Sequence, residues 1–179
     1  MTILTTAPLS TSRLELEVVS VAHAGEAAVT FDSLDLHAFT GGVPSTRAEL
    51  VERYTRFEGG RSPDGTQLWL NWMLRDRMSG ELVGTVQATV EGWGGCAARA
   101  DLAWVVGVRH QQNGYAQESA RAVAEWLRGA GVTALQAYVH PQHEASAAVA
   151  RSLSMKLTTK VLDGELLWTD RADGADTAQ

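Results

Sequence analysis

The most informative stretch of this sequence is an apolar strand that ends abruptly and leads into an amphipathic helix. Residues 98–106 have the composition of a strand, and residues 115–128 place small and apolar side chains on one helical face. Gly114 immediately precedes this helix. A helix N-terminus presents unpaired backbone N–H groups and a partial positive charge, and glycine lets the main chain approach a ligand closely. The junction therefore predicts a site for an anionic group such as phosphate.

The other segments predict a mixture of helices and strands. Alternation of apolar and charged residues indicates the first strand, and Ser45 or Thr46 can cap a helix in which Glu49 closes a capping box. Asp163 and Gly164 are typical of a tight hairpin turn. Strands are predicted over residues 13–19, 67–75, 81–90, 98–106, 134–138, 156–162 and 165–169, and helices over residues 22–36, 46–57, 115–128 and 145–154. This order predicts a mixed α+β fold.

Length and composition indicate one domain. The chain has 179 residues, of which 45% are hydrophobic, which is enough for one sizeable core and short for two. No linker or repeat interrupts the middle of the chain, and the C-terminal segment lacks large apolar residues. We therefore expect a single domain over residues 12–170, with a flexible tail at residues 1–11 and a disordered tail at residues 171–179.

Charge and cysteine content exclude several classes of function. Fifteen Lys and Arg against 21 Asp and Glu give a net charge of −6, and no basic run is present, so we expect no nucleic-acid partner. Cys96 is the only cysteine, which excludes an intrachain disulfide and a cysteine-based zinc site, and we expect no bound metal. No stretch approaches the ~20 apolar residues of a membrane span. We expect a cytoplasmic protein that does not contact a membrane.

Six Trp residues are a high share for a chain of this length. Core packing explains most such side chains, because Trp buries a large area. The wall of a binding pocket, or a contact between the two copies of a homodimer, is the alternative. The three-residue offset between Trp69 and Trp72 places their rings on opposite faces of the predicted strand.

Two blocks of the sequence resemble the GNAT superfamily of N-acyltransferases. The stretch Gln111-Gln112-Asn113-Gly114-Tyr115-Ala116 matches the family pattern Q/R-x-x-G-x-G/A. The block from His140 to Met155 is similar to the family's V-x-P-x-N-x-x-S-x-x-V-A-x-x-L-G-M region. Residues 12–16, 80–84 and 100–104 resemble the RimJ/RimL branch of protein N-terminal acetyltransferases. The resemblance covers about residues 12–170.

The resemblance implies a fold and a donor substrate. Family members have a central, mostly antiparallel twisted sheet of six to seven strands, flanked by about four helices and splayed between the fourth and fifth strands. They hold acetyl-CoA by its pyrophosphate on the loop after the fourth strand and transfer the acyl group to an amine, on a small molecule or a protein N-terminus. The residues that the resemblance assigns to acetyl-CoA are Trp104, Val105, Val106, Val108, Arg109, Gln111, Gln112, Asn113, Gly114, Tyr115, Ala116, His143 and Ser146.

Acyl transfer from a thioester to an amine needs a neutral amine, a polarised carbonyl and a proton for the departing thiolate. The resemblance places a backbone N–H donor for the carbonyl near Val105 or Val106. It suggests Ser146 as the proton donor to the thiolate, since Ala150 stands where many members have a Tyr. A chemically silent serine in the first turn of a helix is the alternative for Ser146.

The general base has several candidates. Asp101 lies where the family often has an acidic residue, and its carboxylate could accept the amine proton through water if burial raises its pKa. A solvated charge on a strand is the alternative for this residue. Glu91, His37 and His110 are further candidates for the base.

Three positions depart from the family pattern. His143 replaces the usual Asn, Ser154 replaces the usual Gly, and Asn113 stands where Lys or Arg is common. Three hypotheses follow. The chain is an active N-acetyltransferase, a coenzyme A-binding module without efficient turnover, or an interaction protein without a coenzyme A site.

Overall fold

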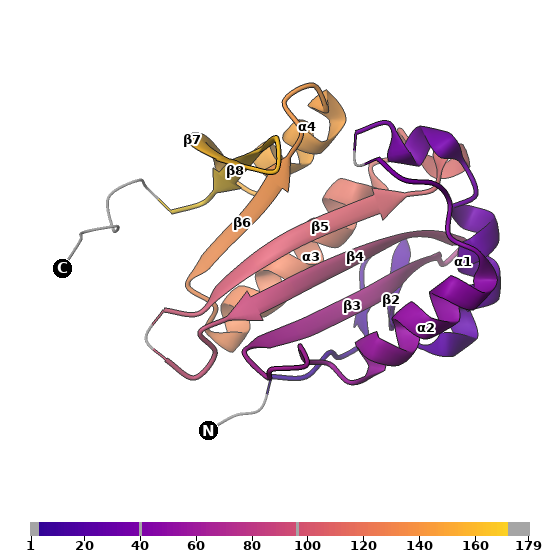
Figure 1. Cartoon of the computed structure of the whole chain (residues 1–179), viewed down its shortest axis with the longest axis horizontal. Helices are drawn as coiled ribbons and strands as arrows, with labels where there is room; N and C mark the ends of the chain where they lie inside the picture. Colours follow the sequence, from indigo (N-terminus) through magenta and orange to yellow (C-terminus); the bar gives the residue numbers. More distant parts are fainter. Residues whose placement is uncertain (1–3, 40, 96, 172–179) are drawn as a thin grey trace.

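Eight strands form one sheet within residues 4–39, 41–95 and 97–171, which the computed structural model describes. The strands are β1 (Leu9–Ser10), β2 (Leu14–Val18), β3 (Gln67–Asp76), β4 (Leu82–Glu91), β5 (Arg99–Val106), β6 (Ala134–Val139), β7 (Lys156–Leu162) and β8 (Glu165–Thr169). Their spatial order is β1-β2-β3-β4-β5-β6-β8-β7, and the neighbours are antiparallel except for β5 and β6 (Figure 1). The predicted mixed fold is confirmed, with one strand more than expected.

Helices cover both faces of this sheet. Within the described ranges the α-helices are α1 (Ala24–Thr30), α2 (Arg47–Glu58), α3 (Tyr115–Ala130) and α4 (Glu144–Ser152). α1 and α2 pack together on one face, where Leu50 and Tyr54 surround Met73 of β3. α3 and α4 pack together over the larger core, to which Val123 and Leu127 contribute. Figure 1 shows α2 in front of the sheet and α3 behind it.

The alternation of side chains along β3 separates these two cores. Trp72 is fully buried and meets Trp126 of α3 edge to face, with ring centroids 5.7 Å apart. Trp69 points the other way and meets Phe57 of α2 edge to face at 6.1 Å. The predicted opposite orientation of the two rings is confirmed, and both contact aromatic side chains of the covering helices.

Local signals in the sequence determine two elements as predicted. Thr46 caps α2: its Oγ1 accepts from Glu49 N (3.3 Å), and Thr46 N donates to Glu49 Oε2 (2.7 Å), which completes the capping box. The turn between β7 and β8 has positive φ at both central residues, 50° at Asp163 and 85° at Gly164, the geometry of a type I′ hairpin. Both features depend on neighbouring residues alone.

The predicted helix over residues 22–36 is wrong. It is divided into a 3₁₀ turn at Val21–His23, the helix α1 at Ala24–Thr30 and a second 3₁₀ turn at Leu34–His37. Ser33 causes the second break, because its Oγ accepts from Asp35 N (3.2 Å) and starts a new turn.

The N-terminal segment takes part in the sheet. Leu9 and Ser10 form the unpredicted strand β1, Leu4 is only 7% exposed, and Trp72 Nε1 donates to Ala7 O at 2.7 Å. Two residues are too few to show a period-2 pattern, so β1 was not predictable from the sequence. Residues 1–3 of the expected N-terminal tail, and residues 172–179 of the expected C-terminal tail, lie outside the described residues.

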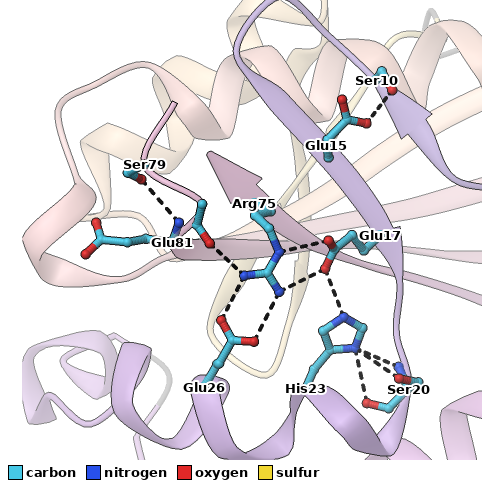
Figure 2. A network of polar contacts seen from close by, with 10 residues as sticks. Ser10, Glu15, Glu17, Ser20, His23, Glu26, Arg75, Ser79 and Glu81 are labelled. Atoms are coloured by element: carbon cyan, nitrogen blue, oxygen red, sulfur yellow. Dashed lines mark hydrogen bonds and ion pairs between the residues drawn. The ribbon is translucent and has the colours of Figure 1, made fainter. Parts of the chain in front are cut away.

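A cluster of charged side chains fastens α1 to the sheet (Figure 2). Arg75 of β3 donates from Nε to Glu17 Oε1 of β2 (2.8 Å) and from Nη1 to Glu26 Oε2 of α1 (2.8 Å). His23 Nε2 lies 3.1 Å from Glu17 Oε2. The hydrogen bonds from the guanidinium are the main reason why the pKa of each carboxyl is below its usual value.

Replacing Arg75 by Met is expected to lower the free energy of unfolding by about 1–2 kcal/mol, measured by urea denaturation. The reason is that Glu17 and Glu26 would face each other without their cation. Both folded pKa values lie below the usual 4.5, so this stabilisation is present above that pH and is lost as the pH falls through the lowered values. The free energies of unfolding of the wild type and of Arg75→Met should therefore become equal in acid.

Arg77→Met is the matched control for this prediction. Arg77 also pairs with a glutamate, Glu15, but both side chains are at least 41% exposed, whereas the Arg75 side chain is 23% exposed. The control should lose less than about 0.5 kcal/mol. Equal losses in the two variants would show that the Arg75 cluster has no special role in holding α1.

Candidate active site

β5 and β6 pair over only three residues and then diverge. Arg99 to Asp101 pair with Ala134 to Gln136, whereas β5 continues to Val106 and β6 to Val139 (Figure 1). On its other side β5 stays paired with β4 as far as Val106. The expected splay is therefore present, and residues 102–106 of β5 have one edge without a strand partner.

The main chain of Val106 faces this free edge. Gly107 N donates to Val83 O (2.9 Å), so the polar groups of residue 107 point toward β4. Successive residues of a strand point their N–H and C=O groups to opposite sides, which directs those of Val106 toward the splay. Val106 O accepts from Gln111 Nε2 (3.1 Å), in agreement with this direction. Of the two expected donors, Val105 and Val106, the geometry favours Val106.

The loop after β5 is exposed and closely turned. A 3₁₀ turn at Val108–His110, which carries the exposed Arg109, leads to Gln112 with φ of 63° and to Gly114 with φ of 79°. Asn113 Nδ2 donates to His110 O (3.1 Å) and holds the turn together. Gly114 is the N-cap of α3, and no side chain among the described residues caps this helix. The N–H groups of its first turn are therefore available to an anionic ligand.

Two contacts fix the loop to the sheet. Arg13, just before β2, donates from Nη1 to Asn113 O (2.9 Å) and from Nε to Glu118 Oε2 (2.7 Å). Tyr115 donates its hydroxyl to Asp76 Oδ2 at 2.5 Å. This bond, with others from the backbone of the β3–β4 turn, lowers the pKa of Asp76 to about 2. The Tyr115 hydroxyl is thus engaged in structure, and Arg13 is a site residue that the sequence did not reveal, because its partner lies 100 residues away.

Three of the predicted site residues meet across the splay. Trp104 of β5 donates from Nε1 to Ser146 Oγ of α4 at 3.3 Å. Ser146 N donates to Nδ1 of His143, the N-cap residue of α4, at 3.4 Å. Burial, and secondarily the charge of His140, lowers the pKa of His143 and favours the neutral ring that can accept this bond.

Asp101 occupies the last β5–β6 pair before the strands diverge. Its Oδ1 is buried and has no hydrogen-bond partner among the described residues. Burial is the main cause that raises the pKa of this carboxyl. Asp101 and Trp104 are three residues apart on one strand, so their side chains lie on opposite faces of the sheet.

Two of the other candidates for the base, Glu91 and His37, have side-chain contacts of their own. Glu91 forms an ion pair with Arg99 and accepts from Gln67 Nε2 at 2.8 Å. His37 Nδ1 lies 3.2 Å from Gly41 O. His110 belongs to the 3₁₀ turn that follows β5. Asp101 is the candidate whose carboxylate retains a buried oxygen without a partner.

The described part of the chain contains no group of three or more His, Cys, Asp or Glu side chains that could hold a metal ion. None of its helices has the length and apolar character needed to span a bilayer.

Similar solved structures share this fold. An acetyltransferase from Agrobacterium tumefaciens str. C58 is 22% identical, with a TM-score of 0.67 over 96% of this chain and 98% of that one. A ribosomal-protein-S5-alanine acetyltransferase from Vibrio fischeri is 13% identical, with a TM-score of 0.69 over 91% of this chain and 95% of that one. RimL, a ribosomal L7/L12 alpha-N-protein acetyltransferase in complex with coenzyme A, is 14% identical. Its TM-score is 0.67 over 91% of this chain and 97% of that one.

The sequence comparisons give the family. No match was found among curated protein sequences. A family model described as an acetyltransferase (GNAT) domain matches residues 13–156, which is most of the chain and includes β5, the loop, α3 and the whole second block from His140 to Met155. The chain belongs to the GNAT family of acetyltransferases.

Proposed function

We propose that this acetyltransferase transfers the acyl group of acetyl-CoA to a primary amine by direct attack in a ternary complex. The observation that carries the proposal is the continuity of the site along the chain. The free edge of β5 at residues 102–106 leads through the turned loop to the uncapped N-terminus of α3. An elongated ligand with a pyrophosphate at one end and a thioester at the other suits this arrangement.

The donor would be held mainly by backbone groups. The N–H groups at Tyr115, Ala116 and the next residue suit the pyrophosphate, with the positive φ of Gly114 giving the close approach. The Val106 N–H suits the thioester carbonyl, whose oxygen gains negative charge when the amine attacks. The absence of a basic side chain at Asn113 is compatible with this mode of binding, because helix N–H groups supply the donors.

The acceptor amine and the departing thiolate would lie on opposite faces of the sheet. Asp101 lies on one face and Trp104 with Ser146 on the other, so an amine that approaches beside Asp101 attacks the carbonyl at the splay between them. Asp101 accepts the amine proton through water as the new N–C bond forms. The C–S bond breaks toward the opposite face, where the thiolate needs a proton.

Ser146 is suited to pass that proton to the thiolate, directly or through water, while its Oγ recovers a proton from solvent so that no alkoxide is left. Its Oγ accepts from Trp104 Nε1, so its own hydroxyl hydrogen remains free to be donated. Ser146→Ala is expected to lower kcat by about 10- to 100-fold with little change in the affinity for acetyl-CoA, since the contact is needed only when the thiolate forms. Release of free thiol from acetyl-CoA, together with calorimetric binding of coenzyme A, measures the two quantities.

Ser152→Ala is the control for this variant. Ser152 lies at the other end of α4, where its Oγ donates to Val149 O (2.7 Å), and its loss should leave kcat unchanged. An unchanged rate in Ser146→Ala would remove Ser146 from the mechanism and leave it as an ordinary first-turn serine.

A panel of acceptors separates the active enzyme from the alternative, a coenzyme A-binding module without efficient turnover. The panel should contain peptides with free N-termini, polyamines and aminoglycosides, and should begin with the peptides, because the RimL and Vibrio fischeri structures are those of ribosomal-protein acetyltransferases. Thiol release with at least one amine supports the proposal. Tight binding of coenzyme A without thiol release from any acceptor would favour the binding module.

A further inference from the structure

The last residue of α1 and the segment that follows it contact the residues that come directly after β5 and β6. At one side, Thr30 packs closely on Gly107: a Cβ added to Gly107 would lie only 2.7 Å from Thr30 O. At the other side, Phe39 stacks on His143 with ring centroids 4.4 Å apart and an interplanar angle of 24°. Gly107 follows β5, and His143 follows β6. Residues 30–39 thus connect the ends of the two diverging strands.

The ring of His143 needs such support. Histidine is an unusual N-cap, and its bond from Ser146 N is long at 3.4 Å. An imidazole can turn about two side-chain bonds, and only Nδ1 without a proton accepts from this N–H. Phe39 covers one face of the ring, and His140 lies beside Phe39 with a centroid distance of 5.2 Å.

We propose that Phe39 is a positioning residue of the acyl-transfer site, which holds the His143 ring so that α4 is capped and Ser146 Oγ is kept beside Trp104 Nε1. The chain of contacts runs from Phe39 to His143, from His143 Nδ1 to Ser146 N, and from Ser146 Oγ to Trp104. Its consequence for turnover rests on the proposed role of Ser146. The orientation of the His143 ring does not depend on that role.

A double-mutant cycle tests the transmission through His143. Phe39→Leu keeps an apolar side chain but loses the stack, and should lower kcat about threefold to tenfold with little change in the KM for acetyl-CoA. Phe39→Tyr should retain the rate. In a His143→Asn background the shorter amide caps α4 without a stacked ring, so Phe39→Leu should have no further effect. An equal loss in both backgrounds would overturn the proposal.

Phe57→Leu is the matched control for the loss of an aromatic ring. Phe57 stacks on Tyr54 and meets Trp69, away from α4, so kcat should not change. A loss as large as that of Phe39→Leu would mean that the rate responds to general loosening of the fold.

NMR gives a readout that needs no turnover. Among the described residues, His140 in the preceding turn is the titratable group that acts on the His143 ring, and the neighbouring Glu144 of α4 is paired with Arg151. Loss of the stack should expose the ring, so that the pKa of His143 rises toward its ordinary value and the amide resonance of Ser146 shifts. If both stay at their wild-type values, Phe39 does not position the ring, whether or not the protein proves to acetylate amines.

Discussion

Asp101→Asn is expected to lower kcat by about 10²- to 10⁴-fold, the range typical for loss of a general base. An amide has the shape of the carboxylate but cannot take the proton of the amine. The KM for acetyl-CoA should change little, because Asp101 lies on the face of the sheet opposite Trp104 and Ser146. Steady-state kinetics with an excess of acceptor measures both constants.

The pH dependence of kcat/KM in the wild type also tests whether Asp101 is the general base. Burial raises the pKa of Asp101 above the ordinary 3.8, so kcat/KM should fall on an acidic limb that lies above that value. The folded pKa exceeds the unfolded one, which means that the stability contribution of Asp101 decreases as the pH rises from 3.8 through the folded value. Asp101→Asn should therefore melt at the same or a higher temperature than the wild type at neutral pH.

Glu91→Gln is the control for Asp101. Glu91 is engaged by Arg99 and Gln67, so its replacement should leave kcat within about twofold, with at most a small loss of stability. A wild-type rate in Asp101→Asn would exclude this carboxylate as the base. A large loss of rate in Glu91→Gln instead would transfer the role to Glu91.

Gly114→Val is expected to weaken the binding of coenzyme A by about 100-fold, or about 2.7 kcal/mol. Gly114 has φ of 79°, a conformation that is strained for a β-branched residue, and an added Cβ would lie 3.4 Å from Arg13 Nη2. The strain displaces the first-turn N–H groups of α3 from the positions that suit a pyrophosphate. Isothermal titration calorimetry with coenzyme A measures the loss.

Gly131→Val provides a matched control at the other end of the same helix. Gly131 also has positive φ, 105°, and an added Cβ would meet no atom within 4 Å. The two variants carry a similar backbone strain, so both should melt at a lower temperature than the wild type. Binding should be lost only in Gly114→Val. Equal affinities in the two variants would place the pyrophosphate away from the N-terminus of α3.

Features fixed by neighbouring residues were predictable from the sequence. The junction between β5 and α3 is predictable because an apolar strand, a loop glycine and an amphipathic helix follow one another directly along the chain. The capping box of Thr46 and Glu49, and the hairpin turn at Asp163 and Gly164, were predictable for the same reason. Ser154, which stands in place of the family's glycine, adopts φ of 63°, a left-handed conformation that explains why glycine is the usual residue there.

The parts of the site that depend on tertiary contacts could not be predicted. The hydrogen bond between Trp104 and Ser146 joins residues 42 positions apart, and the stack of Phe39 on His143 joins residues still farther apart. Periodicity gives the face on which a side chain lies but not what it meets there. The same limit applies to Asp101, because the burial that raises its pKa comes from packing of the sheet and not from its own strand.

The most direct test of the donor site is a titration of the 15N-labelled protein with coenzyme A, followed through its backbone amide resonances. The largest shifts are expected at Gly114, Tyr115 and Ala116, with a further group along residues 102–106 of β5. The fragment adenosine 3′,5′-bisphosphate lacks the pyrophosphate and the pantetheine arm, and should shift neither group to the same extent. Saturable shifts that leave the α3 N-terminus and the free edge of β5 unaffected would contradict the proposed donor site.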